Sequence, residues 1–279
     1  MGWKGSARPA GLAVAVACAL AGAAEATWSI VAVDPETREV GVAGASCILD
    51  ADVIAILVPG QGAAVAQAYT NPDGRVRLRK QIEQGRSAQG SIDAVTTRLF
   101  DSFLAAPLYQ LRQYGVVTLT EGDAPAHFTG RWTIDHAGGR TGPNVSVQGN
   151  TLHGPEVLDE ALAAFLHTPA GCRPRLAERL LAAVVAGSEA GGDKRCVPEL
   201  AALSAFLQVA APGDLPDAPS LSLEAQRPGE PPWNPWREIQ NSIRPAPGTR
   251  DENPVLLLAA AFDRQRAADP ASGPRCYGP

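Results

Sequence analysis

The sequence predicts an α+β fold in which helices cover two faces of a largely antiparallel double sheet. Three observations indicate this: runs rich in β-branched residues, two separate pairs of segments with helical spacing, and the alternation of these along the chain. The order is strands, two helices, strands, two helices and strands, which is typical of helices placed on the two outer faces of layered sheets. The chain has 279 residues, of which 45% are hydrophobic and 19% charged, so it can bury a core of this size.

Residues 1–26 have the features of a secretory signal peptide. Lys4 and Arg8 precede an apolar run, and Ala24-Glu25-Ala26 is a small-x-small cleavage site. The apolar run is shorter than the roughly 20 residues that a membrane-spanning helix needs. Cleavage would therefore leave Thr27 as the first residue of a protein exported to a periplasm or out of the cell, with no membrane contact afterwards.

The cysteines fit an oxidising compartment. Cys18 is removed with the signal peptide; its use as a lipid anchor is the alternative, which Ala15 disfavours because a bulky aliphatic residue is usual there. The remaining cysteines are Cys47, Cys172, Cys196 and Cys276. This even number predicts two disulfides and leaves three connectivities open. We favour a bond between Cys172 and Cys196 because they flank a predicted helix.

The exported chain is predicted to begin with two hairpins and two helices. β-branched residues and an Asp-Pro turn mark the first hairpin, and the turn Pro59-Gly60-Gln61-Gly62 marks the second. The four expected strands are residues 27–34, 39–46, 54–58 and 63–68. Helical spacing follows in residues 76–84 and 91–105, where Ser91 is the expected N-cap. These two helices are expected to cover one face of a sheet.

The second half of the chain repeats this order of elements. Strand patterns occur at residues 114–120, 128–134, 145–148, 205–210 and 221–225. A second helical pair is expected between them, over residues 156–166 and 175–185. We therefore expect one domain over residues 27–226.

A Pro-rich insertion follows this domain at residues 227–253. It contains Trp233 and Trp236, whose indole rings could stack on a carbohydrate or a partner. Packing of the loop on its own domain is the simpler interpretation. A last helix over residues 254–266 is expected in the C-terminal segment 254–279, which closes the same domain.

Charge and motif spacing exclude several classes of function. The net charge is −5, without a basic stripe that would bind nucleic acid. No Gly-x-Ser-x-Gly elbow and no phosphate-binding glycine loop occurs. The histidines lack the spacing of metal ligands and are interpreted as surface or loop residues: His127, His136, His153 and His167. We expect no metal and no cofactor.

Thr27 would acquire two reactive groups on cleavage, its hydroxyl and a free α-amine. The pKa of an α-amine is about 7.7 to 8.0, so a substantial fraction is unprotonated at neutral pH and can accept the hydroxyl proton. Many exported proteins begin with an inert residue after the cleavage site, and this is the alternative. Because Thr27 directly opens a predicted strand, its position would be fixed rather than free.

Seven segments carry a family resemblance, in this order: TWSIVAVDPETREVGVAGASC, PGQGAAVAQAYTNP, LRQYGVV, FTG, RTGPNVSVQGNTLHGPEVLDEAL, LAERLLAAVVAGSEAGGDKRC and LSAFLQVAAPGD. They resemble the bacterial domain of unknown function 1028 family, in its exported, cysteine-containing branch. The resemblance implies the four-layer αββα sandwich of N-terminal nucleophile hydrolases. It also implies that Thr27 occupies the position of the family's N-terminal Thr or Ser, but it supplies no substrate.

Carboxamide side chains are the expected partners of Thr27, because they can hold an oxyanion or a substrate amide without adding charge. The two motifs AQAYTNP and SVQGN supply Gln67, Asn71, Gln148 and Asn150. We assign Asn71 and Asn150 to catalysis with Thr27, and Gln67 and Gln148 to substrate binding. Turn formation by Asn71-Pro72 and Gly149 is the structural alternative.

Two further residues are assigned to substrate binding. Ser46 ends the first predicted hairpin, beside Cys47. Asp193 lies in the segment GGDKR, where it could orient Arg195 or the α-amine, and an ion pair with Arg195 is the simpler interpretation. In cytosolic relatives this segment continues with Gly and then Gln, whereas Cys196 follows here.

Two functional hypotheses remain open at the level of the sequence. The first is a hydrolase of amide-like bonds acting on a small molecule or peptide, with Thr27 as nucleophile and its amine as base. The second is a non-catalytic exported binding or scaffold protein with the same fold. Either could form oligomers.

Overall fold

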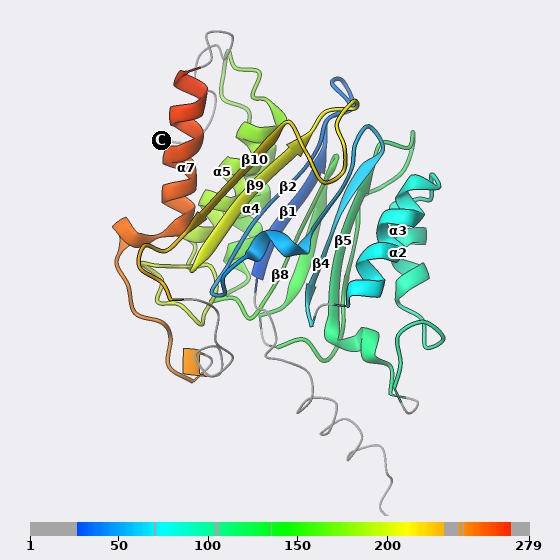
Figure 1. The fold of residues 1–279 in the computed structure, drawn as a ribbon, viewed down its shortest axis with the longest axis horizontal. Coiled ribbons are helices and arrows are strands. Elements are labelled where there is room, and N and C mark those ends of the chain that lie inside the picture. Colours follow the sequence, from blue (N-terminus) through cyan, green and yellow to red (C-terminus); the bar gives the residue numbers. More distant parts are fainter. Residues whose placement is uncertain are drawn as a thin grey trace, which may run out of the picture.

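The strands and helices form four layers, helices, sheet, sheet and helices, in the order αββα (Figure 1). The structure is a computed structural model that describes residues 27–69, 71–103, 106–134, 136–231, 240–241 and 243–268. The predicted signal peptide, Cys18, the two tryptophans of the Pro-rich loop and Cys276 lie outside the described residues. The predicted α+β layered fold is confirmed.

The first sheet has six antiparallel strands in the order β10-β9-β2-β1-β8-β7. Their bounds are β1 Thr27–Val33, β2 Val40–Ser46, β7 Gly138–Gly142, β8 Val145–Asn150, β9 Ser204–Ala210 and β10 Leu221–Gln226. β1 lies between β2 and β8, and the register places Thr27 opposite Ser46 on one side and Asn150 on the other. Thr27 is therefore at the end of an interior strand.

The second sheet has four antiparallel strands in the order β3-β4-β5-β6. Their bounds are β3 Ala55–Val58, β4 Gly62–Ala68, β5 Arg112–Thr118 and β6 Ala126–Thr129. The strand predicted over residues 128–134 is wrong in its bounds, and β7 was not predicted. Its sequence GGRTG has no apolar alternation, so only pairing with β8 makes it a strand.

In the described part of the chain, five α-helices cover the outer faces of the sheets. Two of them, α2 and α3, pack on the four-stranded sheet, and the others pack on the six-stranded sheet (Figure 1). Their bounds are α2 Pro72–Glu83, α3 Ala88–Val95, α4 Glu156–Leu166, α5 Leu176–Glu189 and α7 Pro254–Ala267.

The helix predicted over residues 91–105 is wrong at both ends. Ser87 caps α3 by accepting a hydrogen bond from the backbone N–H of Gly90, so Ser91 lies inside the helix. The helix ends at Val95, and Leu99 is 98% exposed. Apolar residues recur at helical intervals beyond Val95, but Leu99 has no neighbouring surface to pack against, so the pattern does not form a helix there.

The side chains of β1 alternate between two layers. Trp28 and Ile30 pack against α4 and α5 in one apolar cluster. Val31 and Val33 belong to a second apolar cluster between the two sheets. Thr27 faces the same inter-sheet layer, because it is separated from Val31 by an even number of residues.

The disulfide assignment is corrected by the structure. Cys47 is bonded to Cys196, 149 residues away in sequence. Cys172 is also disulfide-bonded. The predicted bond between Cys172 and Cys196 is therefore wrong, because the fold brings the segment after β2 beside the segment after α5.

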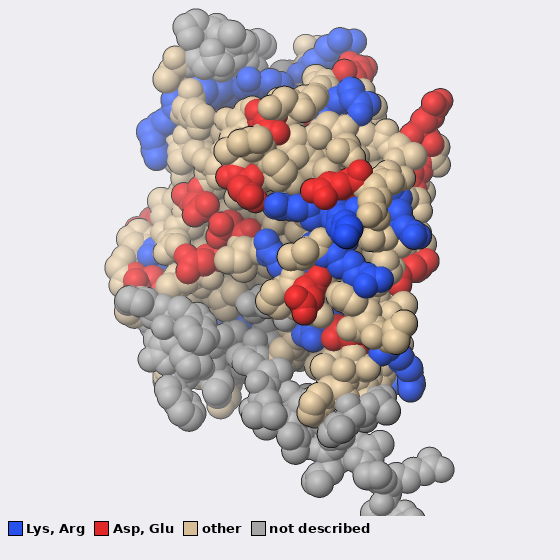
Figure 2. Space-filling model, turned by 45° about the vertical axis from the view of Figure 1, so that its right-hand side comes forward, with Lys and Arg blue, Asp and Glu red and all other residues tan. Residues whose placement is uncertain are grey.

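The surface carries charges of both signs. On the face in Figure 2, Lys and Arg side chains are interspersed with Asp and Glu side chains. Among the described residues, no helix is both long and apolar enough to cross a bilayer.

Candidate active site around Thr27

The inter-sheet layer is polar at the end where Thr27 lies. The buried polar residues that face this layer, each at most 1% exposed, are Thr27, Ser29, Ser46, Gln67, Gln113, Ser146, Gln148 and Asn150. They come from both sheets, on strands β1, β2, β4, β5 and β8. Buried polar groups are costly unless they are hydrogen-bonded, so their pairing defines the site.

Thr27 is held by both sheets. Its Oγ1 donates a hydrogen bond to the Oγ of Ser46 at 3.2 Å. Its carbonyl oxygen accepts a hydrogen bond from the Nε2 of Gln67, on the facing sheet, also at 3.2 Å. The predicted neighbours Ser46 and Gln67 are thus in contact with Thr27.

Gln113, at the start of β5, connects the amide side chains. Its Oε1 accepts hydrogen bonds from Gln67 Nε2 at 2.8 Å and from Asn150 Nδ2 at 3.1 Å. Its Nε2 donates to the carbonyl of Gly149 at 2.8 Å. Gln113 was not predicted as a site residue, although it lies in the segment LRQYGVV. Its polar side chain among the apolar residues of a strand was the available signal.

Gln148, on β8, lies opposite Ser29, which is two residues along β1 from Thr27. Its Nε2 donates to the Oγ of Ser29 at 2.7 Å, and Ser29 donates to Oε1 of Gln67 at 2.6 Å. The Oε1 of Gln148 accepts from Ser146 at 2.9 Å. Gln148 therefore braces the neighbours of Thr27 without contacting the Thr27 hydroxyl itself.

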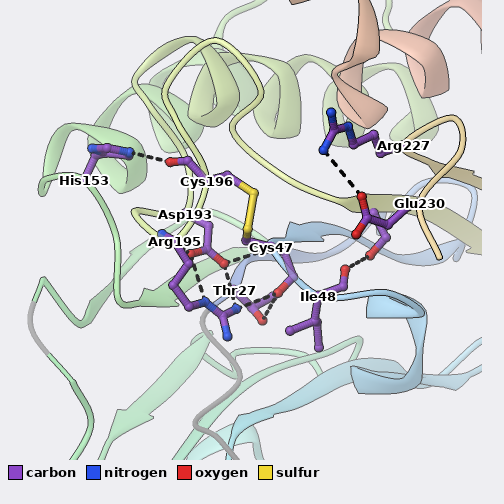
Figure 3. Close-up of a disulfide and its surroundings, with 11 residues drawn as sticks. Thr27, Cys47, Ile48, His153, Asp193, Arg195, Cys196, Arg227 and Glu230 are labelled. Atoms are coloured by element: carbon purple, nitrogen blue, oxygen red, sulfur yellow. Dashed lines mark hydrogen bonds and ion pairs between the residues drawn. A yellow bond between two sulfur atoms is a disulfide. The ribbon is translucent and has the colours of Figure 1, made fainter. Parts of the chain in front are cut away.

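Asp193 and Arg195 place a buried ion pair beside the same hydroxyl (Figure 3). The Nη2 of Arg195 lies 2.8 Å from the Oδ2 of Asp193, and the two side chains are 2% and 0% exposed. The same Nη2 lies 3.4 Å from the Oγ of Ser46. The ion pair predicted from the sequence is thus present, and the side chain of Ser46 lies between Arg195 and Thr27.

Asn71 is placed differently. Its Oδ1 accepts hydrogen bonds from the backbone N–H groups of Asp73 at 3.1 Å and Gly74 at 3.2 Å, so it is the N-cap of α2. Within the described part of the chain, no hydrogen bond joins it to Thr27. The turn-forming alternative accounts for this residue.

The comparisons with known proteins agree with this architecture. Residues 27–232 match DUF1028, a family of unknown function. The chain belongs to the DUF1028 family. Its match to the family begins at Thr27.

A solved structure of a DUF1028 protein has the same fold. The crystal structure of protein SPO2555 from Silicibacter pomeroyi aligns with a TM-score of 0.64 at 24% sequence identity, covering 88% of each chain. This likeness concerns the fold. The search of curated proteins finds no match.

Among the described residues of this DUF1028 protein, no hydrogen bond joins a histidine to Thr27. His153 lies close to Cys196, with its Nε2 at 3.1 Å from the carbonyl oxygen of that residue. In the segments that the structure describes, there is no group of three or more His, Cys, Asp or Glu residues that could hold a metal ion.

A surface cavity of about 220 Å³ lies at a different place, where α5 and α7 meet the β9–β10 edge. Its lining includes Arg175, Arg266 and Phe262. None of the polar residues around Thr27 lines it. It is separate from the candidate site of this DUF1028 protein.

The cluster around Thr27 can support acyl transfer. It combines a hydroxyl with the amide group of Asn150, which gives one of its two N–H groups to Gln113, and a well-placed amide donor stabilises an oxyanion by about 2.7 to 4 kcal/mol. Both N–H groups of Gln67 are engaged, by the Thr27 carbonyl and by Gln113. The ion pair of Asp193 and Arg195 leaves no net charge beside the hydroxyl.

Proposed function

We propose that this protein is an exported N-terminal nucleophile hydrolase that cleaves amide-like C–N bonds with Thr27. The observation that supports this most is the position of Thr27: it opens an interior strand, and its hydroxyl and carbonyl are held from both sheets. The start of the family match at Thr27 also supports it. Substrates would be small molecules or peptides.

The proposed reaction begins with removal of residues 1–26, which frees the α-amine of Thr27. The amine takes the hydroxyl proton while Thr27 Oγ1 attacks the substrate carbonyl carbon. Collapse of the tetrahedral intermediate breaks the C–N bond, and the ammonium group gives its proton to the leaving amine. Water then hydrolyses the ester on Thr27, with the amine again acting as base.

The surrounding residues have distinct proposed roles. Asn150 supplies an amide N–H donor for the oxyanion or for the substrate amide, with the N–H that it does not give to Gln113. Gln67, whose two N–H groups bind the Thr27 carbonyl and Gln113, fixes Thr27 next to the bound substrate. Ser46 positions the nucleophile by accepting its hydrogen bond. Gln148 braces the amides through Ser29, and Asp193 fixes Arg195. Asn71 acts indirectly, by starting α2 next to the strand that carries Gln67.

Export to a periplasm or to the cell exterior is part of the proposal. The amino-terminal segment predicts it, and two disulfide-bonded sites are compatible with an oxidising compartment.

The test combines amino-terminal sequencing of the exported protein with labelling by an electrophilic acyl probe. The mature protein should begin at Thr27 and carry the label there. Thr27→Ala should lose the label with its circular dichroism unchanged, Thr27→Ser should keep it, and Thr37→Ala, in an exposed turn, is the matched control. A start one residue earlier would block the amine and contradict the mechanism.

A non-catalytic binding protein is the second candidate. The cavity between α5, α7 and the β9–β10 edge, remote from Thr27, favours it. Absence of labelling in a mature protein that begins at Thr27 would support this candidate over the hydrolase.

A further inference from the structure

The Cys47–Cys196 disulfide joins the two chain segments that carry Ser46 and Arg195 (Figure 3). Cys47 directly follows Ser46 at the end of β2. Cys196 directly follows Arg195 in the loop between α5 and β9. A covalent bond thus connects the nearest neighbours of both residues.

The Asp193 carboxylate makes a second, non-covalent connection between the same segments. Its Oδ2 accepts a hydrogen bond from the backbone N–H of Cys47 at 2.7 Å and one from Arg195 Nη2 at 2.8 Å. Its Oδ1 accepts from the backbone N–H of Arg195 at 2.9 Å. Both charged side chains and both cysteines are at most 2% exposed. The connection is therefore shielded from water, where hydrogen bonds to charged groups are strongest.

Two hydrogen bonds link Arg195, which the disulfide and Asp193 hold, to the Thr27 hydroxyl. Arg195 Nη2 donates to Ser46 Oγ at 3.4 Å, and Ser46 Oγ accepts from Thr27 Oγ1 at 3.2 Å. Because Ser46 Oγ accepts from both groups, the position of Arg195 fixes the direction in which the Thr27 hydroxyl points. Arg195 itself does not need to touch a substrate.

We infer that Arg195 is a positioning residue for the Thr27 hydroxyl, acting through Ser46, and that the Cys47–Cys196 disulfide holds it in place. The inference rests on the proposed function, since it assigns a task to Thr27. It gives the disulfide a role in the site as well as in stability. Misplacement of a reacting group by about 1 Å can lower a rate about 100-fold, so a small shift of Ser46 has a measurable effect.

The test compares Cys47→Ala/Cys196→Ala with Cys172→Ala, which breaks the disulfide of the loop between α4 and α5. All proteins are checked by circular dichroism and by amino-terminal sequencing. We expect the maximal rate constant of acyl-probe labelling to fall about 10-fold or more in the double variant, with the half-saturating probe concentration changing less than about twofold. Cys172→Ala should label like the wild type.

Arg195→Lys is the second variant, because it keeps the disulfide and the charge. We expect it to label more slowly than the wild type and faster than Arg195→Met, since an ammonium group can reach either Asp193 or Ser46 but lacks the planar fork that reaches both. A purely structural role for Arg195 predicts equal labelling by all folded Arg195 variants. Wild-type labelling in the folded disulfide variant and in both Arg195 variants would overturn the inference.

Hydrogen exchange gives a readout that does not depend on activity. The backbone N–H of Cys47, which donates to Asp193, should exchange about 10-fold faster or more in the disulfide variant and not in Cys172→Ala. If the wild type does not label at all, the proposed function fails by itself. Unchanged exchange at Cys47 would then also overturn the role of the disulfide in holding this segment.

Discussion

At the scale of single residues, the candidate site depends on amide and hydroxyl groups that satisfy one another. Thr27 contacts Ser46 and Gln67, and Gln67 and Asn150 meet at the Oε1 of Gln113. Such a network fixes its members only while each donor keeps its acceptor. Its central residue is therefore the most sensitive position.

Gln113→Leu should lower the free energy of unfolding by about 2 to 4 kcal/mol. The change leaves the amide groups of Gln67 and Asn150 without their shared acceptor, and each buried unsatisfied group costs about 1 to 3 kcal/mol. Urea denaturation measures the effect. Gln61→Leu, at an exposed turn position, is the control, and an equal effect of both changes would contradict the prediction.

Tyr114 is a second residue whose environment has a measurable consequence. Its hydroxyl is buried without a hydrogen-bond partner among the described residues. Burial, reinforced by the charge of Asp101, raises the pKa of Tyr114 above the ordinary value of 10.0. We expect Tyr114→Phe to raise the free energy of unfolding by about 1 kcal/mol near neutral pH.

The alkaline dependence of this effect has a definite sign. Above about pH 10 the unfolded chain releases the Tyr114 proton while the folded protein keeps it, so the unfolded state binds fewer protons. The stability of the wild type should therefore fall relative to Tyr114→Phe as the pH rises above about 10. Urea denaturation of both proteins between pH 9 and about pH 11 measures this, and a constant difference would contradict the raised pKa.

At the scale of elements, the close approach of the two sheets requires a glycine in β5. A Cβ on Gly115 would overlap the side chain of Gln148, which reaches across from β8 in the other sheet. The absence of a side chain at this position thus allows Gln148 to brace Ser29.

Gly115→Ala should lower the free energy of unfolding by about 1 to 3 kcal/mol, because Gln148 must leave its position. It should also slow labelling at Thr27, since the brace on Gln67 is lost with it. Gly213→Ala is the matched control, because a Cβ there meets no atom within 4 Å. Stability of Gly115→Ala within about 0.5 kcal/mol of the wild type would contradict the packing argument.

At the scale of the whole molecule, the disulfide between Cys47 and Cys196 closes a loop with a sequence separation of 149 residues. Closing so long a loop restricts the unfolded chain strongly. Cys47→Ala/Cys196→Ala should therefore lower the free energy of unfolding by about 3 to 5 kcal/mol, measured in urea without reductant. A loss below about 1 kcal/mol would show that the unfolded chain is not restricted in this way.

The layered fold and most of its elements follow from the sequence alone, because strand and helix periods are local properties. The spacing of apolar residues predicted α4, α5, α7 and the first four strands to within a few residues. It failed at β7, whose glycines become a strand only by pairing with β8, and beyond Val95, where helical spacing lacks a surface to cover.

The sequence also singled out Thr27, its amide neighbours and an ion pair of Asp193 with Arg195, since a predicted cleavage site and the chemistry of single residues can be read from a linear chain. Only the tertiary structure brought Gln113 into the centre of the site, assigned Asn71 to a helix cap and paired Cys47 with Cys196. Each of these depends on contacts between segments far apart in sequence. Such contacts are decided by how the two sheets stack, which no local pattern encodes.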